Sequence, residues 1–242
     1  EVLRARDDVL FGANGVLALV AKGELPAAAA KLREAPEIPP DLQALGAPVL
    51  ELGTWLADAQ AAMQELQSKL SASQPRVQLR GSEHRVRSMS ANGVLILRGP
   101  DDQDTTIALH DEPEVQRQIL LPSAGSAGPL KLDASQRKRA GLFLLFAVAQ
   151  AVPVARGLVA DGKAPAAEQA TSVPVLRGLL QCTKLPQGDS YRDEALGLHA
   201  FARLVRALQN KAEVVAASWA ARLEEDAPNS LIGHALGVRS PG

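Results

Sequence analysis

The hydrophobic positions follow two different periods along the chain, and the change between them divides it into three parts. Before residue 75 and after residue 121, apolar residues recur every three or four positions, which predicts amphipathic helices. Between these segments the pattern alternates or is apolar over short runs, which predicts β-strands. We therefore expect a mostly α protein of the α+β class. Helical hairpins would flank an antiparallel barrel or sheet of roughly four to five strands. The predicted domains are an N-terminal helical hairpin region (1–74), a small β-barrel or sheet (75–121) and a C-terminal helical region (122–242).

Four strands are predicted in the β segment. Asn92-Gly93 supplies the pair of positive φ angles that a tight hairpin needs, and Gly99-Pro100-Asp101-Asp102 supplies a second turn. The third strand is apolar at Val94-Leu95-Ile96-Leu97, as in a central strand covered on both faces. The expected strands are Arg76–Gly81, His84–Met89, Val94–Arg98 and Thr105–His110.

The segment before the strands predicts a helical hairpin and a long helix. Gly12 and Gly15 weaken the first helix, and Gly23 closes it as a C-terminal glycine does. An alanine-rich helix then starts at Pro26, which suits the first helical turn. Pro48 either kinks the long helix or marks its start. The expected helices are Val2–Lys22, Pro26–Arg33 and Leu42–Ser71.

The segment after the strands is also helical, with prolines at the expected breaks. Asp133 or Ser135 is the predicted cap of a helix that ends near Gln150, and Pro153 starts another. An apolar helix followed by a proline-started helix thus occurs twice, near residues 16–28 and 143–155, which is typical of helical repeats. The other expected helices are Pro113–Leu121, Ser190–Glu225 with Asp189 as its cap, and Leu231–Leu236.

Composition and charge narrow the function classes. Of the 242 residues 46% are hydrophobic, which is enough for a core, but the aromatic content of 3% means that Leu, Val and Ala must build it. With a net charge of −1, the protein has no overall electrostatic field that would attract nucleic acid or anionic membranes. No apolar run reaches the ~20 residues of a membrane span, so we expect no membrane insertion. Cys182 is the only cysteine, which fits a reducing, cytoplasmic location, although a disulfide-free exported domain would look the same. The start at Glu1 suggests a piece of a larger protein, and the location stays open if that parent protein is exported or membrane-anchored.

The sequence contains no recognisable nucleotide-binding or hydrolase motif. Neither a Gly-x-x-x-x-Gly-Lys-Ser/Thr loop nor a Gly-x-Ser-x-Gly elbow occurs. Asp189, Asp193 and Glu194 are interpreted as helix-start carboxylates, and Trp55 and Trp219 as core anchors. The four histidines, at positions 84, 110, 199 and 234, lack the spacing of metal ligands. We expect no catalytic residue, no cofactor and no metal. An enzyme site assembled from distant residues, such as His84, His110 and Asp104, stays open as an alternative.

A local basic patch on the strands is the one candidate binding surface. Small sheets with such patches bind RNA or DNA in some proteins, so nucleic-acid binding is a second alternative. No aromatic residue lies between positions 76 and 110 to stack on a base, and six carboxylates follow within residues 101–114. Local ion pairing on a solvated face is therefore the preferred interpretation. The patch consists of Arg76, Arg80, Arg85, Arg87 and Arg98.

Two segments carry a resemblance to known families. Gly23-Glu24-Leu25-Pro26-Ala27-Ala28-Ala29-Ala30-Lys31-Leu32 resembles the turn and second helix of a degenerate tetratricopeptide-type hairpin. Residues 93–102 with 105–109 resemble the end of a small SH3-like or Sm-like barrel. This order is similar to non-catalytic regions of large bacterial multidomain proteins, some beside a serine/threonine kinase domain. The resemblance implies a scaffold or protein-interaction region with a protein partner and no catalytic residues.

Overall fold

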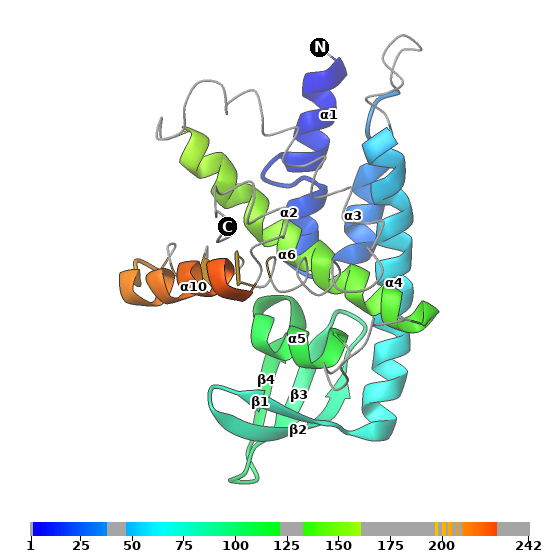
Figure 1. The fold of residues 1–242 in the computed structure, drawn as a ribbon. Helices are drawn as coiled ribbons and strands as arrows, with labels where there is room; N and C mark the ends of the chain where they lie inside the picture. Colours follow the sequence, from blue (N-terminus) through cyan, green and yellow to red (C-terminus); the bar gives the residue numbers. More distant parts are fainter. Residues whose placement is uncertain are drawn as a thin grey trace. The chain divides into compact units, whose positions relative to one another are not determined.

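The computed structural model describes residues 2–37, 47–121, 133–160 and, with gaps, 197–226 (Figure 1). They belong to two compact units. The first unit contains Glu1–Ser126 and Asp133–Phe146, and the second contains Ala127–Leu132 and Ala147–Gly242. The predicted α+β class is confirmed, since helices flank an antiparallel sheet. The proposed division into three domains stays a prediction.

Three short helices open the first unit: α1 (Val2–Phe11), α2 (Val16–Ala21) and α3 (Leu25–Leu32). The single helix predicted over the first two is wrong, because the chain turns between Gly12 and Gly15, where glycine has low helix propensity. Residues 12–15 thus interrupt a helical segment. They do not follow a β-strand, as the residues of a phosphate-binding loop do.

The predicted helical hairpin is present, with α2 and α3 in contact around Gly23. The φ angle of Gly23 is +74°, a left-handed conformation that favours glycine. Its N–H donates to the carbonyl of Val20 (2.9 Å), and the next N–H, of Glu24, donates to Leu19 (2.9 Å). The turn thereby satisfies carbonyls at the end of α2 and reverses the chain.

Helix α4 (Ala47–Ser73) connects the helical part of this unit to the sheet. Its contacts include α3 and β2, as Figure 1 also shows. Near α3, the Gln60 side chain donates from Nε2 to the carbonyl of Leu25 (3.1 Å). Pro48 lies in its first turn, so this proline marks the start of the helix; residues 38–46 lie outside the described part of the chain. The buried positions recur at helical spacing and are Leu52, Trp55, Leu56, Ala59, Ala62, Met63, Leu66 and Leu70.

The sheet has four antiparallel strands in the order β1-β2-β3-β4, so every strand pairs with its neighbours in sequence. The sheet is not closed, which corrects the barrel alternative: β1 and β4 are its two edges. One face is buried, and α4 and α5 contact the sheet at β2 and β1 respectively. The strands are β1 (Arg76–Leu79), β2 (Ser82–Met89), β3 (Val94–Arg98) and β4 (Asp104–Ala108). The buried face carries Val77, Leu79, Val86, Met89, Leu95, Leu97 and Ile107.

The turns of the sheet differ in part from the prediction. Arg80 and Gly81 both have positive φ angles (52° and 83°) and connect β1 to β2, so the first strand ends two residues earlier than expected. Between β2 and β3 only Gly93 has positive φ, and its N–H donates to Ser90 O (3.0 Å); the positive φ predicted for Asn92 is wrong. The second predicted turn, residues 99–102, is confirmed by the Asp102 N–H donating to Gly99 O (3.1 Å).

A short 3-10 helix and α5 (Pro113–Leu120) follow β4. The 3-10 helix, Leu109–Asp111, replaces the end of the predicted fourth strand. Buried Gln116 fixes α5 to it, because its Nε2 donates to the carbonyl of Leu109 (2.8 Å). The amphipathic pattern of α5 places Val115, Ile119 and Leu120 in the core.

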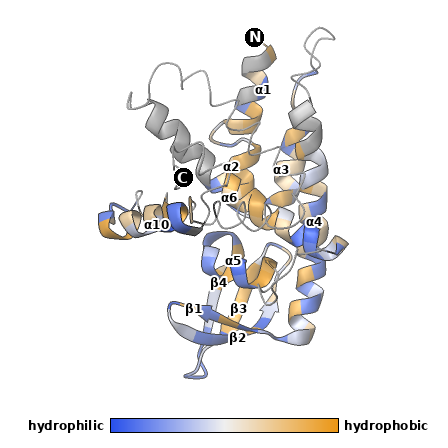
Figure 2. Ribbon diagram, in the orientation of Figure 1, coloured by the Kyte–Doolittle hydropathy of each residue, from blue (hydrophilic) through white to orange (hydrophobic). Residues whose placement is uncertain are grey.

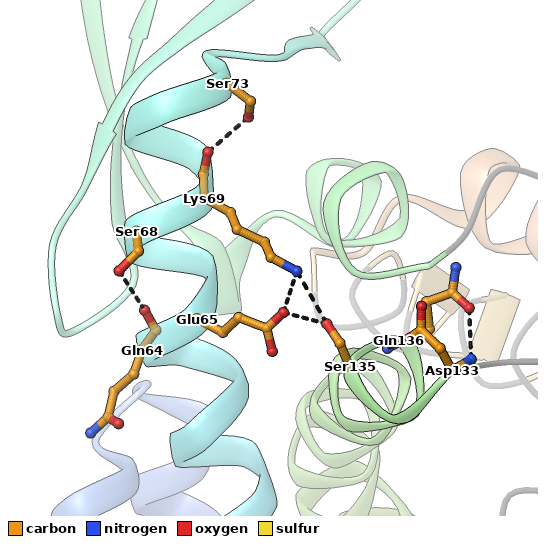
Figure 3. Close-up of polar contacts among 8 residues, drawn as sticks. All are labelled: Gln64, Glu65, Ser68, Lys69, Ser73, Asp133, Ser135 and Gln136. Carbon is orange, nitrogen blue, oxygen red and sulfur yellow. Dashed lines mark hydrogen bonds and ion pairs between the residues drawn. The ribbon is translucent and has the colours of Figure 1, made fainter.

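Helix α6 (Ala134–Ala160) begins with a capping box. The Asp133 carboxylate accepts from the Gln136 N–H (2.7 Å), while the Gln136 side chain accepts from the Asp133 N–H (2.9 Å), so Asp133 is the cap (Figure 3). The helix continues through Pro153, so the predicted break and second hairpin at this position are wrong. Residues 142–149 are all buried, and Figure 2 shows the apolar middle of this helix.

Side chains of α4 join α4 to the first half of α6. Trp55 is 6% exposed and donates from Nε1 to the carbonyl of Gly141 (2.8 Å), which confirms it as a core anchor. Further along α4, Glu65 and Lys69 both contact Ser135 (Figure 3). This cluster holds the start of α6 against α4.

The second unit contains the rest of α6 and α10 (Glu213–Asp226). Lys211 has a φ angle of 54°, so the long helix predicted to Glu225 is interrupted there. Trp219 is half-buried rather than fully buried, and the guanidinium groups of Arg203 and Arg222 lie 5.4 and 5.0 Å from its ring. The predictions for Cys182, His234, the cluster Asp189, Asp193 and Glu194, and helix Leu231–Leu236 fall outside the described residues.

Candidate binding surface on the sheet

A row of charged residues crosses the exposed side of the sheet. The register places Arg76 opposite Arg85, Arg85 opposite Arg98, and Arg98 opposite Asp104, one from each strand. Cross-strand partners share a face of the sheet, so these four side chains lie on the side away from the buried residues. We call this side the outer face; it also carries Gln78, Glu83, Ile96 and Thr106.

Like charges directly opposite each other destabilise a sheet, and carboxylates offset this here. Arg76 donates to Glu83 (2.8 Å), and Arg98 donates to Asp102 (2.7 Å) and Asp104 (2.5 Å). The Arg98 guanidinium is the main reason that the pKa of Asp104 lies below its ordinary value. Such exposed pairs contribute little to stability, because water and salt screen them. Their effect is to leave the face with nearly balanced charge.

Two of the predicted arginines keep a free guanidinium on this surface. Arg85, at the centre of the row, and Arg87, at a β-bulge in β2, are exposed and make no ion pair with the residues that the structure describes. The positive charge of Arg87 also contributes to lowering the pKa of Asp104, after the hydrogen bond from Arg98. The fifth arginine, Arg80, lies in the β1–β2 turn and pairs with Glu112 (3.3 Å), outside the row.

An apolar residue lies beside these arginines. Ile96 is 37% exposed and is paired with Ser88 and Thr106 on the neighbouring strands. The prediction that β3 is covered on both faces is therefore wrong for its second face, although β3 is an inner strand as expected. The outer face thus offers an exposed apolar side chain next to free positive charge.

The two edges of the sheet differ. At the β1 edge, the Gln118 side chain of α5 accepts from the Gln78 N–H (2.7 Å) and donates to the Gln78 carbonyl (2.9 Å), as a neighbouring strand would. This side chain blocks the β1 edge for further strand pairing. Sequence reasoning missed Gln118, since it lies 40 residues from its partner and no local pattern marks it.

The structure does not bring together His84 and His110, the two histidines of the catalytic alternative. His84 lies near the β1–β2 turn end of the sheet, with Nδ1 3.1 Å from Ser82 O, while His110 follows the far end of β4. The register separates these histidines along the strands by about 20 Å, so they do not meet across the sheet. Within the described ranges, no group of three or more His, Cys, Asp or Glu residues is placed to hold a metal ion.

The polar cluster of Glu65, Lys69 and Ser135 is structural (Figure 3). Hydrogen bonds from Lys69 first, and from Ser135 second, lower the pKa of Glu65, so its carboxylate stays ionised. The cluster joins two helices, and although the Ser135 hydroxyl donates to Glu65, the lowered pKa of that carboxyl makes it a weak base.

No described helix combines the length and apolarity needed to cross a bilayer. No protein-family model, curated protein or solved structure matches the chain.

Proposed function

We propose that this chain is a non-catalytic scaffold or protein-interaction region, and that a protein partner binds the outer face of its sheet. The observation that carries the proposal is the exposed Ile96 beside the unpaired guanidinium groups of Arg85 and Arg87. Arginine is enriched among the residues that dominate binding energy at protein interfaces, and an apolar contact beside it excludes water. The matching partner segment has an apolar residue for Ile96 and carboxylates for the two arginines.

The resemblance of residues 23–32 and 93–109 to hairpin and barrel segments of large bacterial proteins supports the same proposal. Nucleic-acid binding is the weaker alternative, because Arg76 and Arg98 are already paired with carboxylates and no aromatic side chain lies on the strands. Phosphate backbones are bound by accumulated positive charge, and this face has nearly balanced charge.

The experiment places a photo-crosslinking amino acid at Ile96 and, as a control, at Ala30, which is exposed on α3. A partner that is captured at position 96 but not at position 30 is purified and titrated against the wild-type protein. Arg85→Glu with Arg87→Glu should weaken its binding by about tenfold or more, while Arg33→Glu, at another exposed arginine, should not.

Three results would contradict the proposal. Capture could be equal at both positions, or binding could be unchanged in the double variant. The third is turnover of a substrate that is lost on replacing His84, His110 or Asp104. Salt-dependent retention on RNA or heparin that falls for Arg80→Ala with Arg85→Ala would instead favour nucleic-acid binding.

A further inference from the structure

The free edge of β4 presents backbone groups that no other strand of the described sheet pairs with. The β3–β4 ladder begins with the Gly99 N–H donating to Gln103 O (2.8 Å) and ends with the Leu109 N–H donating to Gly93 O (2.9 Å). Because alternate residues bond to the same neighbour in an antiparallel pair, Thr105 and Ile107 also face β3. The residues between them turn their N–H and C=O groups away from the sheet; these are Asp104, Thr106 and Ala108. The Ala108 carbonyl is already the first acceptor of the 3-10 helix that follows, so its N–H and both groups of Asp104 and Thr106 are left for a further strand.

Natural edge strands usually carry a device that prevents further pairing. At the other edge of this sheet, Gln118 is that device. Residues 104–108 contain neither proline nor lysine, their inward side chains Thr105 and Ile107 are uncharged, and three of the five residues are β-branched. The strand is therefore suited to pair with another strand.

We infer that the β4 edges of two copies of this chain pair antiparallel about a twofold axis at Thr106. In that register Thr106 faces its own equivalent and Asp104 faces Ala108 of the second copy, so no like charges are directly opposed. Arg98 also neutralises Asp104 within each copy. The paired edges would exchange roughly four backbone hydrogen bonds: two between the Thr106 residues, and one from each Ala108 N–H to the Asp104 carbonyl of the other copy.

Pairing of two copies through the same edge is favoured over head-to-tail association of many copies. Head-to-tail association would require β4 of one copy to pair with β1 of the next, and Gln118 occupies the backbone groups of Gln78 there. Pairing of β4 with β4 uses the same surface on both copies and therefore closes after two. The result is one continuous sheet with its outer faces on the same side. The pairing is independent of partner binding at the outer face, because it uses backbone groups of the edge.

The test measures the mass of the full chain by sedimentation over a wide concentration range. The wild-type protein should show a monomer–dimer equilibrium with no larger species. Thr106→Pro removes an edge N–H without removing a β3–β4 hydrogen bond, because that N–H points outward. It should weaken dimerisation by about tenfold or more while the circular dichroism spectrum stays unchanged. Arg85→Glu with Arg87→Glu should leave the dimer intact, so failure of this inference is distinct from failure of the proposed function.

A cysteine cross-link keeps the test decisive if the proline variant does not fold. In a Cys182→Ser background, Thr106→Cys should cross-link to its equivalent with a short bis-maleimide, and Ala72→Cys, at an exposed position of α4, should not. A wild-type protein that stays monomeric at all concentrations would overturn the inference. So would a dimer without the Thr106 cross-link, or association that continues beyond two copies.

Discussion

Replacing Gly23 with alanine should destabilise the protein through one identifiable contact. An added Cβ would lie 2.5 Å from Nδ1 and 3.0 Å from Cε1 of the His110 ring. That ring is only 14% exposed and lies 6.3 Å from the ring of Phe146, so it has little room to move. The substitution also places a Cβ at a φ angle of +74°, which is costly for any L-residue.

Gly81 separates these two costs. It has a similar φ angle of +83°, but a Cβ there meets no atom within 4 Å. Gly81→Ala should therefore lower the free energy of unfolding by the backbone cost alone, about 1–2 kcal/mol. Gly23→Ala should add a packing cost of about 1–3 kcal/mol, for a total of about 2–5 kcal/mol.

Urea unfolding of both variants, alone and with His110→Ala, measures the contact directly. In the His110→Ala background, Gly23→Ala should cost no more than Gly81→Ala, which gives a coupling energy of about 1–3 kcal/mol. Equal losses for the two glycine variants in the wild-type background would refute the close approach of Gly23 and His110.

Two further predictions concern α4. Trp55→Phe should lower the free energy of unfolding by about 1–3 kcal/mol in urea, because the Gly141 carbonyl loses its 2.8 Å donor inside the core; no change would mean that water replaces the indole. The folded-state pKa of Glu65 lies below its ordinary value of 4.5. Its contribution to stability is therefore complete above that pH and is lost as pH falls through the lower folded-state pKa. Between pH 6 and lower values, the free energy of unfolding should fall less steeply with decreasing pH for Glu65→Gln than for the wild-type protein. An equal pH dependence of the two proteins would contradict this role of Glu65.

Strand order in the β segment could be predicted because its signals are local. Alternation at Val77 and Leu79, and the turn at Gly99–Asp102, are enough to define neighbouring strands. The Arg80–Gly81 turn was missed because arginine is uncommon at positive φ. The continuous helix through Pro153 was missed because a proline normally ends or kinks a helix, and tertiary context overrides this preference.

The surface itself could be predicted only in part. The arginines were found from their clustering, and local pairing is present for three of them: Arg76, Arg80 and Arg98. The exposure of Ile96 was not predictable, because an apolar strand does not show whether its second face is covered. The difference between the two edges depends on one glutamine from α5, Gln118. The hydrophobic periodicity of the sequence does not indicate such a side-chain contact.

The order of the strands also affects how the chain folds. Each strand pairs with the next one in sequence, so the sheet can form through short loops that cost little entropy to close. The contacts between α4 and α6 instead join residues that are 66 to 86 positions apart. Contacts at such separations slow folding, because the chain between them must be ordered first. We therefore expect the sheet to form early and α6 to dock onto α4 late, so a chain still being synthesised can fold its sheet before α6 is complete.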